Sequence, residues 1–167
     1  MEIKDLQVVR FTQSAMVSII PPVLFEQLVE VDKGVRLDAL IKTAAAGMAN
    51  PQTYFFGFIN PSINQVVAFL WCVHSLLKNR LVIYYMSALK EYQGHNILAK
   101  YFELCKGVVD RLKLDKTLEL YSLHANIAQA YGGKPSATTI WQFDTQSPDY
   151  GLRPRKEPQD VAEIEAT

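Results

Sequence analysis

The residues best suited to chemistry lie in a polar turn at residues 91–96, between an apolar strand at residues 81–88 and a long amphipathic helix. The turn contains Gln93, Gly94, His95 and Asn96. A strand, a glycine-containing turn and a helix N-terminus bring free backbone N–H groups and the positive end of the helix dipole to one place. The pattern therefore predicts an anion-binding site at this turn, with His95 either meeting a phosphate or lying in solvent.

The elements that must position this turn follow from turn signals and apolar periodicity. We expect strands at residues 6–12, 54–59, 66–77, 81–88, 117–123 and 138–143, and helices at residues 23–31, 37–48, 97–112 and 126–131. Ser14 is expected to cap a further helical segment. The strand at 117–123 returns after a crossover helix and should lie parallel to the strand at 81–88. The predicted fold class is α/β of the α+β kind, with a central mixed, mostly antiparallel sheet flanked by helices.

Length and charge favour one domain with no strongly charged partner. The chain has 167 residues, of which 49% are hydrophobic, and this is enough to bury a core. We assign the core to residues 1–143 and a polar, proline-containing tail to residues 144–167, which a homo-oligomer or an assembly partner could order. Seventeen basic and seventeen acidic residues cancel, so the overall charge gives no signal for nucleic acid or an anionic membrane.

Several functional classes lack their sequence signatures. Cys72 and Cys105 each lie inside an apolar run, where we expect buried, free thiols and neither a disulfide framework nor a metal site. There is no Ser-His-Asp set, HExxH motif, P-loop lysine or Cys-x-x-Cys pair, which argues against most hydrolases, NTPases and zinc proteins. The chain also shows no signal peptide and no apolar run near the ~20 residues that span a bilayer. We therefore expect a soluble, cytoplasmic protein.

The order of elements and the turn together resemble the GCN5-related N-acetyltransferase (GNAT) superfamily. The order β-α-α-β-β-β-α-β-α-β covers roughly residues 6–143, and the prominent turn joins the fourth strand to the third helix. In that family the turn has the pattern Gln/Arg-x-x-Gly-x-Gly/Ala and holds the pyrophosphate of acetyl-CoA. Gln93 matches the first position of this pattern, and Asn96 and Leu98 stand at the two glycine positions.

The resemblance implies an N-acyltransferase that moves an acetyl group from acetyl-CoA to an amine of unknown identity. It implies cofactor contacts from the end of the fourth strand, from the turn and from a residue after the fifth strand: Met86, Ser87, Ala88, Gln93, Gly94, His95, Asn96, Ile97, Leu98 and Asn126. His124 is the candidate base, because imidazole titrates near neutrality, and Tyr131 is the candidate acid for the leaving thiolate. Two plainer interpretations stay open. In the first, residues 86–88 are ordinary residues at the end of a strand, and in the second, His124 is a loop histidine without a catalytic role.

A second interpretation is an inactive descendant of the same fold that serves as a binding or structural subunit. Leu98 counts against acetyl-CoA, because a bulky side chain there could block the close approach of a phosphate. Ala128 and Gln129 occupy the place where the family frequently has a catalytic tyrosine. Acetyltransferase-like domains of this kind occur in the virions of tailed phages, so the virion is the alternative location.

Overall fold

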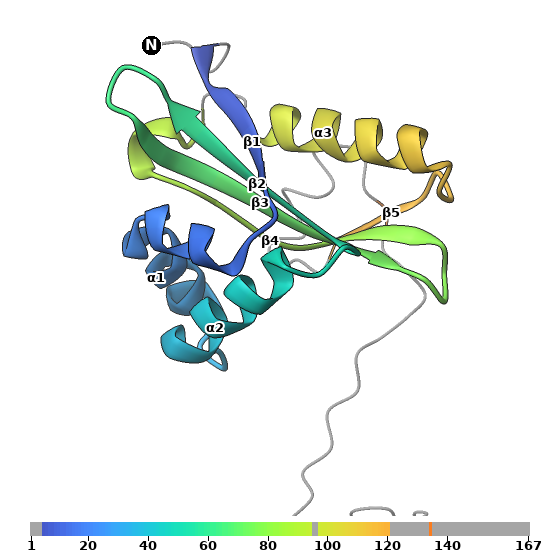
Figure 1. The fold of residues 1–167 in the computed structure, drawn as a ribbon, viewed down its shortest axis with the longest axis horizontal. Coiled ribbons are helices and arrows are strands. Elements are labelled where there is room, and N and C mark those ends of the chain that lie inside the picture. The colour runs from blue at the N-terminus through green and yellow to red at the C-terminus, as the bar shows by residue number, and fades with distance from the viewer. Residues whose placement is uncertain (1–4, 95–96, 121–133, 135–167) are drawn as a thin grey trace, which may run out of the picture.

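A five-stranded sheet forms the centre of the protein (Figure 1). The structure is a computed structural model and describes residues 5–94, 97–120 and 134. The strands lie side by side in chain order: β1 (Gln7–Phe11), β2 (Thr53–Asn60), β3 (Gln65–Ser75), β4 (Arg80–Ala88) and β5 (Leu118–Leu120). Neighbouring strands are antiparallel except for β4 and β5, which are parallel. The predicted mixed, mostly antiparallel sheet is confirmed.

Helices cover both faces of this sheet. One face carries α1 (Pro22–Val31) and α2 (Leu37–Met48), and the opposite face carries α3 (Ile97–Leu112) (Figure 1). Two short 3₁₀ helices, η2 (Ser14–Ile19) and η3 (Lys90–Tyr92), precede α1 and α3. Pro22 occupies the first turn of α1, where its missing N–H costs no helical hydrogen bond.

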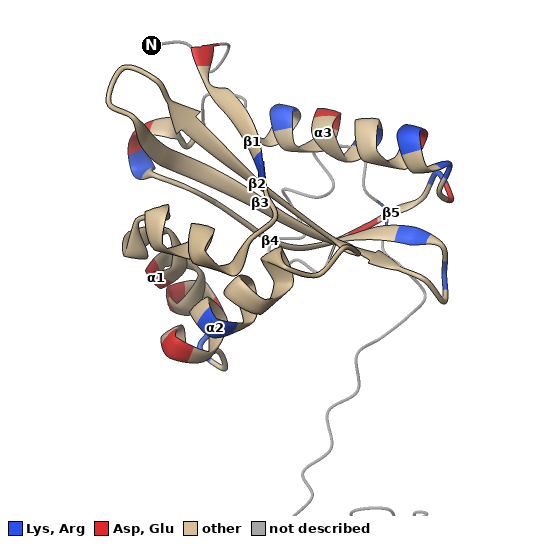
Figure 2. Cartoon of the chain, in the orientation of Figure 1, with Lys and Arg blue, Asp and Glu red and all other residues tan. Residues whose placement is uncertain are grey.

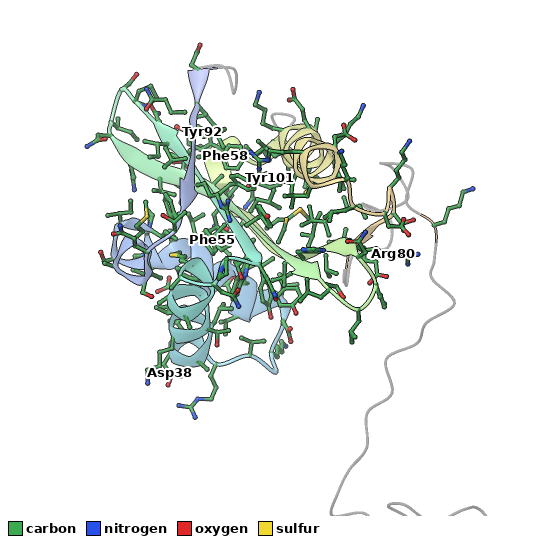
Figure 3. All side chains as sticks on the ribbon, turned by 45° about the vertical axis from the view of Figure 1, so that its right-hand side comes forward. Asp38, Phe55, Phe58, Arg80, Tyr92 and Tyr101 are labelled. Carbon is green, nitrogen blue, oxygen red and sulfur yellow. The ribbon has the colours of Figure 1, made fainter. Side chains whose placement is uncertain are left out.

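Each face of the sheet has its own apolar core, because the side chains of β2 alternate between the two faces. Phe55 packs with Phe69 on the side of α1 and α2, with ring centroids 5.0 Å apart. Phe58 meets Tyr101 of α3 on the other side, at 5.1 Å, as Figure 3 shows. Strands buried on both faces read as continuous apolar runs, as β2 and β3 do.

The two cysteines lie in the core on the α3 side. Cys72 of β3 and Cys105 of α3 are buried free thiols whose sulfur atoms are 3.7 Å apart. Burial raises the pKa of Cys72, and the neighbouring Cys105 raises it further. The prediction that both cysteines are buried hydrophobes is confirmed.

Two details of the predicted elements are wrong. Ser14 is the first residue of η2 and not its cap; Gln13 precedes the helix, and its side chain makes no capping hydrogen bond. The strand predicted at 66–77 ends at Ser75, because Ser75 pairs with Arg80, the first residue of β4. Leu76 and Leu77 therefore lie in the tight β3–β4 turn, where Leu77 is fully exposed.

Ion pairs fasten β5 to the start of β4. Glu119 accepts hydrogen bonds from Lys78 at 3.0 Å and from Arg80 at 3.2 Å, and Arg80 also pairs with Asp115 at 3.3 Å. Figure 2 shows these charges gathered around the β3–β4 turn and β5. Lys78, followed by Arg80, lowers the pKa of Glu119. The network holds the parallel pair that the sequence predicts.

Some predicted elements lie outside the described residues. Of the strand expected at 117–123, the structure describes β5 at Leu118–Leu120, and residues 121–123 lie outside the described part. The helix expected at 126–131, the strand at 138–143 and the tail at 144–167 all fall beyond the described part and stay predictions.

Candidate functional site at the end of strand β4

A bulge interrupts β4 halfway along its length. Trp71 of β3 pairs with Tyr85, whereas Cys72 pairs with Ile83, so Tyr84 is the extra residue. Among the described residues, β4 pairs with β5 only before this bulge, at Leu81–Ile83. Bulges increase the local twist and redirect a strand, and they often occur next to active sites. The β4 residues that the sequence selected as cofactor contacts, Met86, Ser87 and Ala88, all lie after the bulge.

The backbone of this second half of β4 presents polar groups on the side away from β3. The N–H of Leu89 donates to the carbonyl of Val67, 2.8 Å away. Because hydrogen-bonded and non-hydrogen-bonded pairs alternate in an antiparallel ladder, Ser87 also bonds towards β3. Met86 and Ala88 then direct their N–H and C=O groups away from β3. A bound extended chain could form hydrogen bonds with these groups.

Ser87 connects both faces of the sheet at this point. Its carbonyl accepts a hydrogen bond from the Tyr101 hydroxyl of α3, at 2.8 Å. Its own hydroxyl donates to Oε1 of Gln27 on α1, at 3.2 Å. Burial raises the pKa of Tyr101 well above its usual range, so this phenol stays protonated and donates at any working pH.

The turn after β4 is held against the strand by the side chain of Gln93. Its Nε2 donates to the carbonyl of Ala88 at 2.8 Å and lies 3.5 Å from Oε1 of Gln27. Gly94 follows with a φ of +84°, a conformation that glycine adopts without the strain a side chain would bring. Asn60 Nδ2 also donates to the Tyr92 hydroxyl at 2.7 Å, so side-chain hydrogen bonds from Gln93 and Asn60 hold the turn together with the conformation of Gly94.

The N-terminus of α3 begins three residues after Gly94, at Ile97. Ile97 is buried, so it can offer a ligand only its backbone. Leu98 is half-buried and packs against the core cluster on this face of the sheet. The first turn of α3 contains no acidic residue and includes Lys100, so its free N–H groups and helix dipole favour an anion.

Aromatic side chains gather at the bulge around Trp71, which belongs to the core on the α1 and α2 side of the sheet. Tyr84 and Tyr85 both flank Trp71, with ring centroids 6.0 and 5.7 Å from it. Burial raises the pKa of Tyr85, and the Asp32 carboxylate adds to this effect. The Tyr85 hydroxyl is therefore a neutral hydrogen-bonding group at physiological pH.

The structure brings together most of the described residues that the sequence selected. Ser87, Ala88 and Gln93 are joined through hydrogen bonds, and Met86 and Gly94 adjoin them in the chain. Five selected residues lie outside the described part and stay predictions: His95, Asn96, His124, Asn126 and Tyr131.

Sequence reasoning missed Gln27 and Tyr101 as parts of this site. Tyr101 lies on the apolar face of α3, where the periodicity of the helix indicates burial but not the hydrogen bond to Ser87. Gln27 is a single polar residue beside the apolar stripe of α1, and no local pattern indicates its partners, which lie 60 and 66 residues away.

In the described part of the chain, no three His, Cys, Asp or Glu side chains gather as a metal site requires. No helix there is long and apolar enough to cross a membrane.

Comparison with known proteins identifies the fold. Neither the protein-family models nor the curated proteins give a match to this sequence. Solved structures do match. A protein of Clostridium difficile 630 described as a possible acetyltransferase has 16% identity and a TM-score of 0.65, over 83% of this chain and 97% of its own. The chain has the GNAT fold.

Two further GNAT-fold structures agree. A predicted acetyltransferase of Clostridium acetobutylicum, solved with acetyl-CoA, has 12% identity and a TM-score of 0.62, over 83% of this chain and 96% of its own. The enzyme AAC(6')-Iy, in complex with a CoA-containing bisubstrate analogue, has 10% identity and a TM-score of 0.63, over 83% and 97%. The resemblance inferred from the sequence is confirmed for the fold.

Proposed function

We propose that this protein is an N-acyltransferase that transfers an acetyl group from acetyl-CoA to an amine. The observation that supports it most directly is the turn at Gln93 and Gly94, fixed to the end of β4 and followed by the N-terminus of α3. This arrangement offers backbone N–H groups to a diphosphate at the place where the GNAT-fold family holds its cofactor.

The described residues fit acetyl-CoA in two respects. Gly94 has a positive φ, and among the described residues a Cβ placed on it would meet no atom within 4 Å, which leaves room for a ligand on their side. The outward N–H and C=O groups of Met86 and the outward N–H of Ala88 suit the amide-containing pantetheine arm, whereas the Ala88 carbonyl already accepts from Gln93. The N–H groups of the Gly94 backbone and the first turn of α3 would hold the diphosphate, Gln93 would position that turn through its bond to Ala88, and Met86 would hold the arm.

Acetyl-CoA supplies an activated thioester carbonyl. In the proposed reaction the amine nitrogen forms a bond to the carbonyl carbon, the C–S bond breaks, and the departing thiolate takes up a proton. His124 as the base for the amine proton and Tyr131 as the acid for the thiolate remain proposals for residues outside the described part. Tyr101 has no such role, because its hydroxyl is buried and bonded to Ser87.

A second candidate is a GNAT-fold binding or structural subunit without catalysis, for which a phage virion is one proposed setting. Leu98 favours it, because the family pattern has a small residue there. The structure supplies an argument in the other direction. Leu98 packs against the core, so part of its bulk is accommodated on the sheet side of α3 and away from the turn.

Calorimetry with acetyl-CoA separates the two candidates. We expect the natural protein to bind, and to release free thiol from acetyl-CoA when a panel of primary amines is added. Leu98→Gly tests whether bulk at this position limits affinity, and Leu98→Ala controls for the helix weakening that glycine causes. If neither the natural protein nor Leu98→Gly binds at millimolar acetyl-CoA, the acyltransferase proposal fails. Binding by the Leu98 variants alone would support the second candidate.

A further inference from the structure

Gln27 is a polar residue of α1 that contacts the candidate site from the opposite layer of the protein. Its Oε1 lies 3.2 Å from the Ser87 hydroxyl and 3.5 Å from Nε2 of Gln93. Gln27 is half-buried, and α1 packs against β4 along this side. One side-chain atom therefore meets both the end of β4 and the turn that follows it.

The orientation of the Gln27 amide is decided by its neighbours. Nε2 of Gln93 carries only hydrogens to donate, because the Gln93 amide is fixed by its 2.8 Å bond to the Ala88 carbonyl. The atom of Gln27 that faces it must therefore be the oxygen. Oε1 of Gln27 accepts from both Ser87 and Gln93, and the network has one consistent direction.

The two hydrogens of Gln93 Nε2 then have separate functions. One bonds to the Ala88 carbonyl at 2.8 Å and ties the turn to its own strand. The other points to Oε1 of Gln27 at 3.5 Å. This bond is long and weaker, and it adds a second restraint that sets the plane of the Gln93 amide. Without Gln27, the Gln93 side chain keeps one partner but loses the second one that fixes its plane.

We propose that Gln27 is a positioning residue for the acetyl-CoA turn, acting on the cofactor through Gln93 and coupling the position of α1 to the affinity for the donor. This inference rests on the proposed function. A movement of α1 changes the Gln27–Gln93 distance and thereby the placement of the Gly94 backbone. The layer formed by α1 and α2 and the donor turn thus act as one unit.

A double-mutant cycle on acetyl-CoA affinity tests the inference. Gln27→Met keeps the length of the side chain and removes the acceptor. The loss of a long, weak hydrogen bond lies at the low end of the usual range and corresponds to a rise in Kd of about two- to threefold. In a Gln93→Met background the same change at Gln27 should have no further effect. Glu26→Met, on the exposed side of the same helix, is the matched control and should leave Kd unchanged.

Two outcomes of the affinity measurements would overturn the inference. One is an unchanged Kd in Gln27→Met. The other is an effect of equal size with and without Gln93, especially if Ser87→Ala reproduces it, because Gln27 would then only support the packing of α1 on β4. Persistence of the effect without Gln93 is the result that a purely structural role predicts.

A readout without cofactor keeps this test separate from the proposed function. Backbone amide exchange of the segment at residues 90–98 should be faster in Gln27→Met than in the natural protein, and unchanged in Glu26→Met. If the natural protein fails to bind acetyl-CoA, the proposed function fails. If exchange in Gln27→Met is unchanged, the inference fails whatever the cofactor result.

Discussion

The conformation of Gly94 is the feature of the candidate turn that is most open to direct test. Its φ of +84° lies in the left-handed region, and a Cβ added there would meet no atom of the described residues within 4 Å. Gly94→Ala therefore changes the backbone preference without a clash against the described part of the chain. Its cost can be worked out from the backbone alone.

Two opposing contributions set the magnitude for Gly94→Ala. An L-residue held in the left-handed region costs about 1–2 kcal/mol. Alanine also restricts the unfolded chain, which returns about 0.4–1 kcal/mol of stability. We expect a net loss of about 1 kcal/mol, or roughly 2–4 °C in Tm for a chain of this size.

Gly107→Ala is the matched control for the same chemical change. Gly107 lies inside α3, and a Cβ there also meets nothing within 4 Å in the described structure, but no positive φ is involved. Alanine in a helix interior is favoured over glycine by about 0.5–1 kcal/mol. The two substitutions should therefore move Tm in opposite directions.

Thermal unfolding followed by circular dichroism measures both shifts, and calorimetry adds the effect on the donor. If Gly94→Ala relaxes into another turn, binding must restore the native one, and Kd for acetyl-CoA should rise about fivefold for 1 kcal/mol. A Gly94→Ala protein as stable as the natural one, or more stable, would refute the backbone reasoning. Gly107→Ala should leave Kd unchanged.

Two further predictions concern the scaffold that holds the site. Gly57→Ala would place a Cβ against the buried ring of Phe11, so we expect a loss of about 1–3 kcal/mol in the free energy of unfolding, measured by urea denaturation; a loss near zero would contradict this packing. Lys78 and Arg80 lower the pKa of Glu119 from its usual value of 4.5, so the stability from these ion pairs is present above pH 4.5 and is lost as the pH falls further. Tm should therefore fall less steeply below pH 4.5 in Glu119→Gln than in the natural protein, and parallel curves would show that the pairs contribute nothing.

The local sequence patterns determined most of the elements. The three- and four-residue spacing along α3 identifies its buried face, and Ile97, Tyr101, Cys105, Val108 and Val109 are all buried. Crossover by that helix fixed the parallel pairing of β4 and β5. Gln93 and Gly94 were selected from the sequence, since a polar turn with glycine before a helix indicates an anion site by itself.

The three-dimensional packing alone decided how these parts form a site. The bulge at Tyr84, the end of β3 at Ser75 and the direction of the Met86 backbone depend on which residues pair across strands, and no single strand encodes its register. The contacts of Gln27 with Ser87 and Gln93 join residues 60 or more positions apart. A local pattern records which side of an element is apolar, whereas a polar contact between layers exists only after the layers have packed. The sequence therefore determined the turn, and the tertiary structure determined what holds it in place.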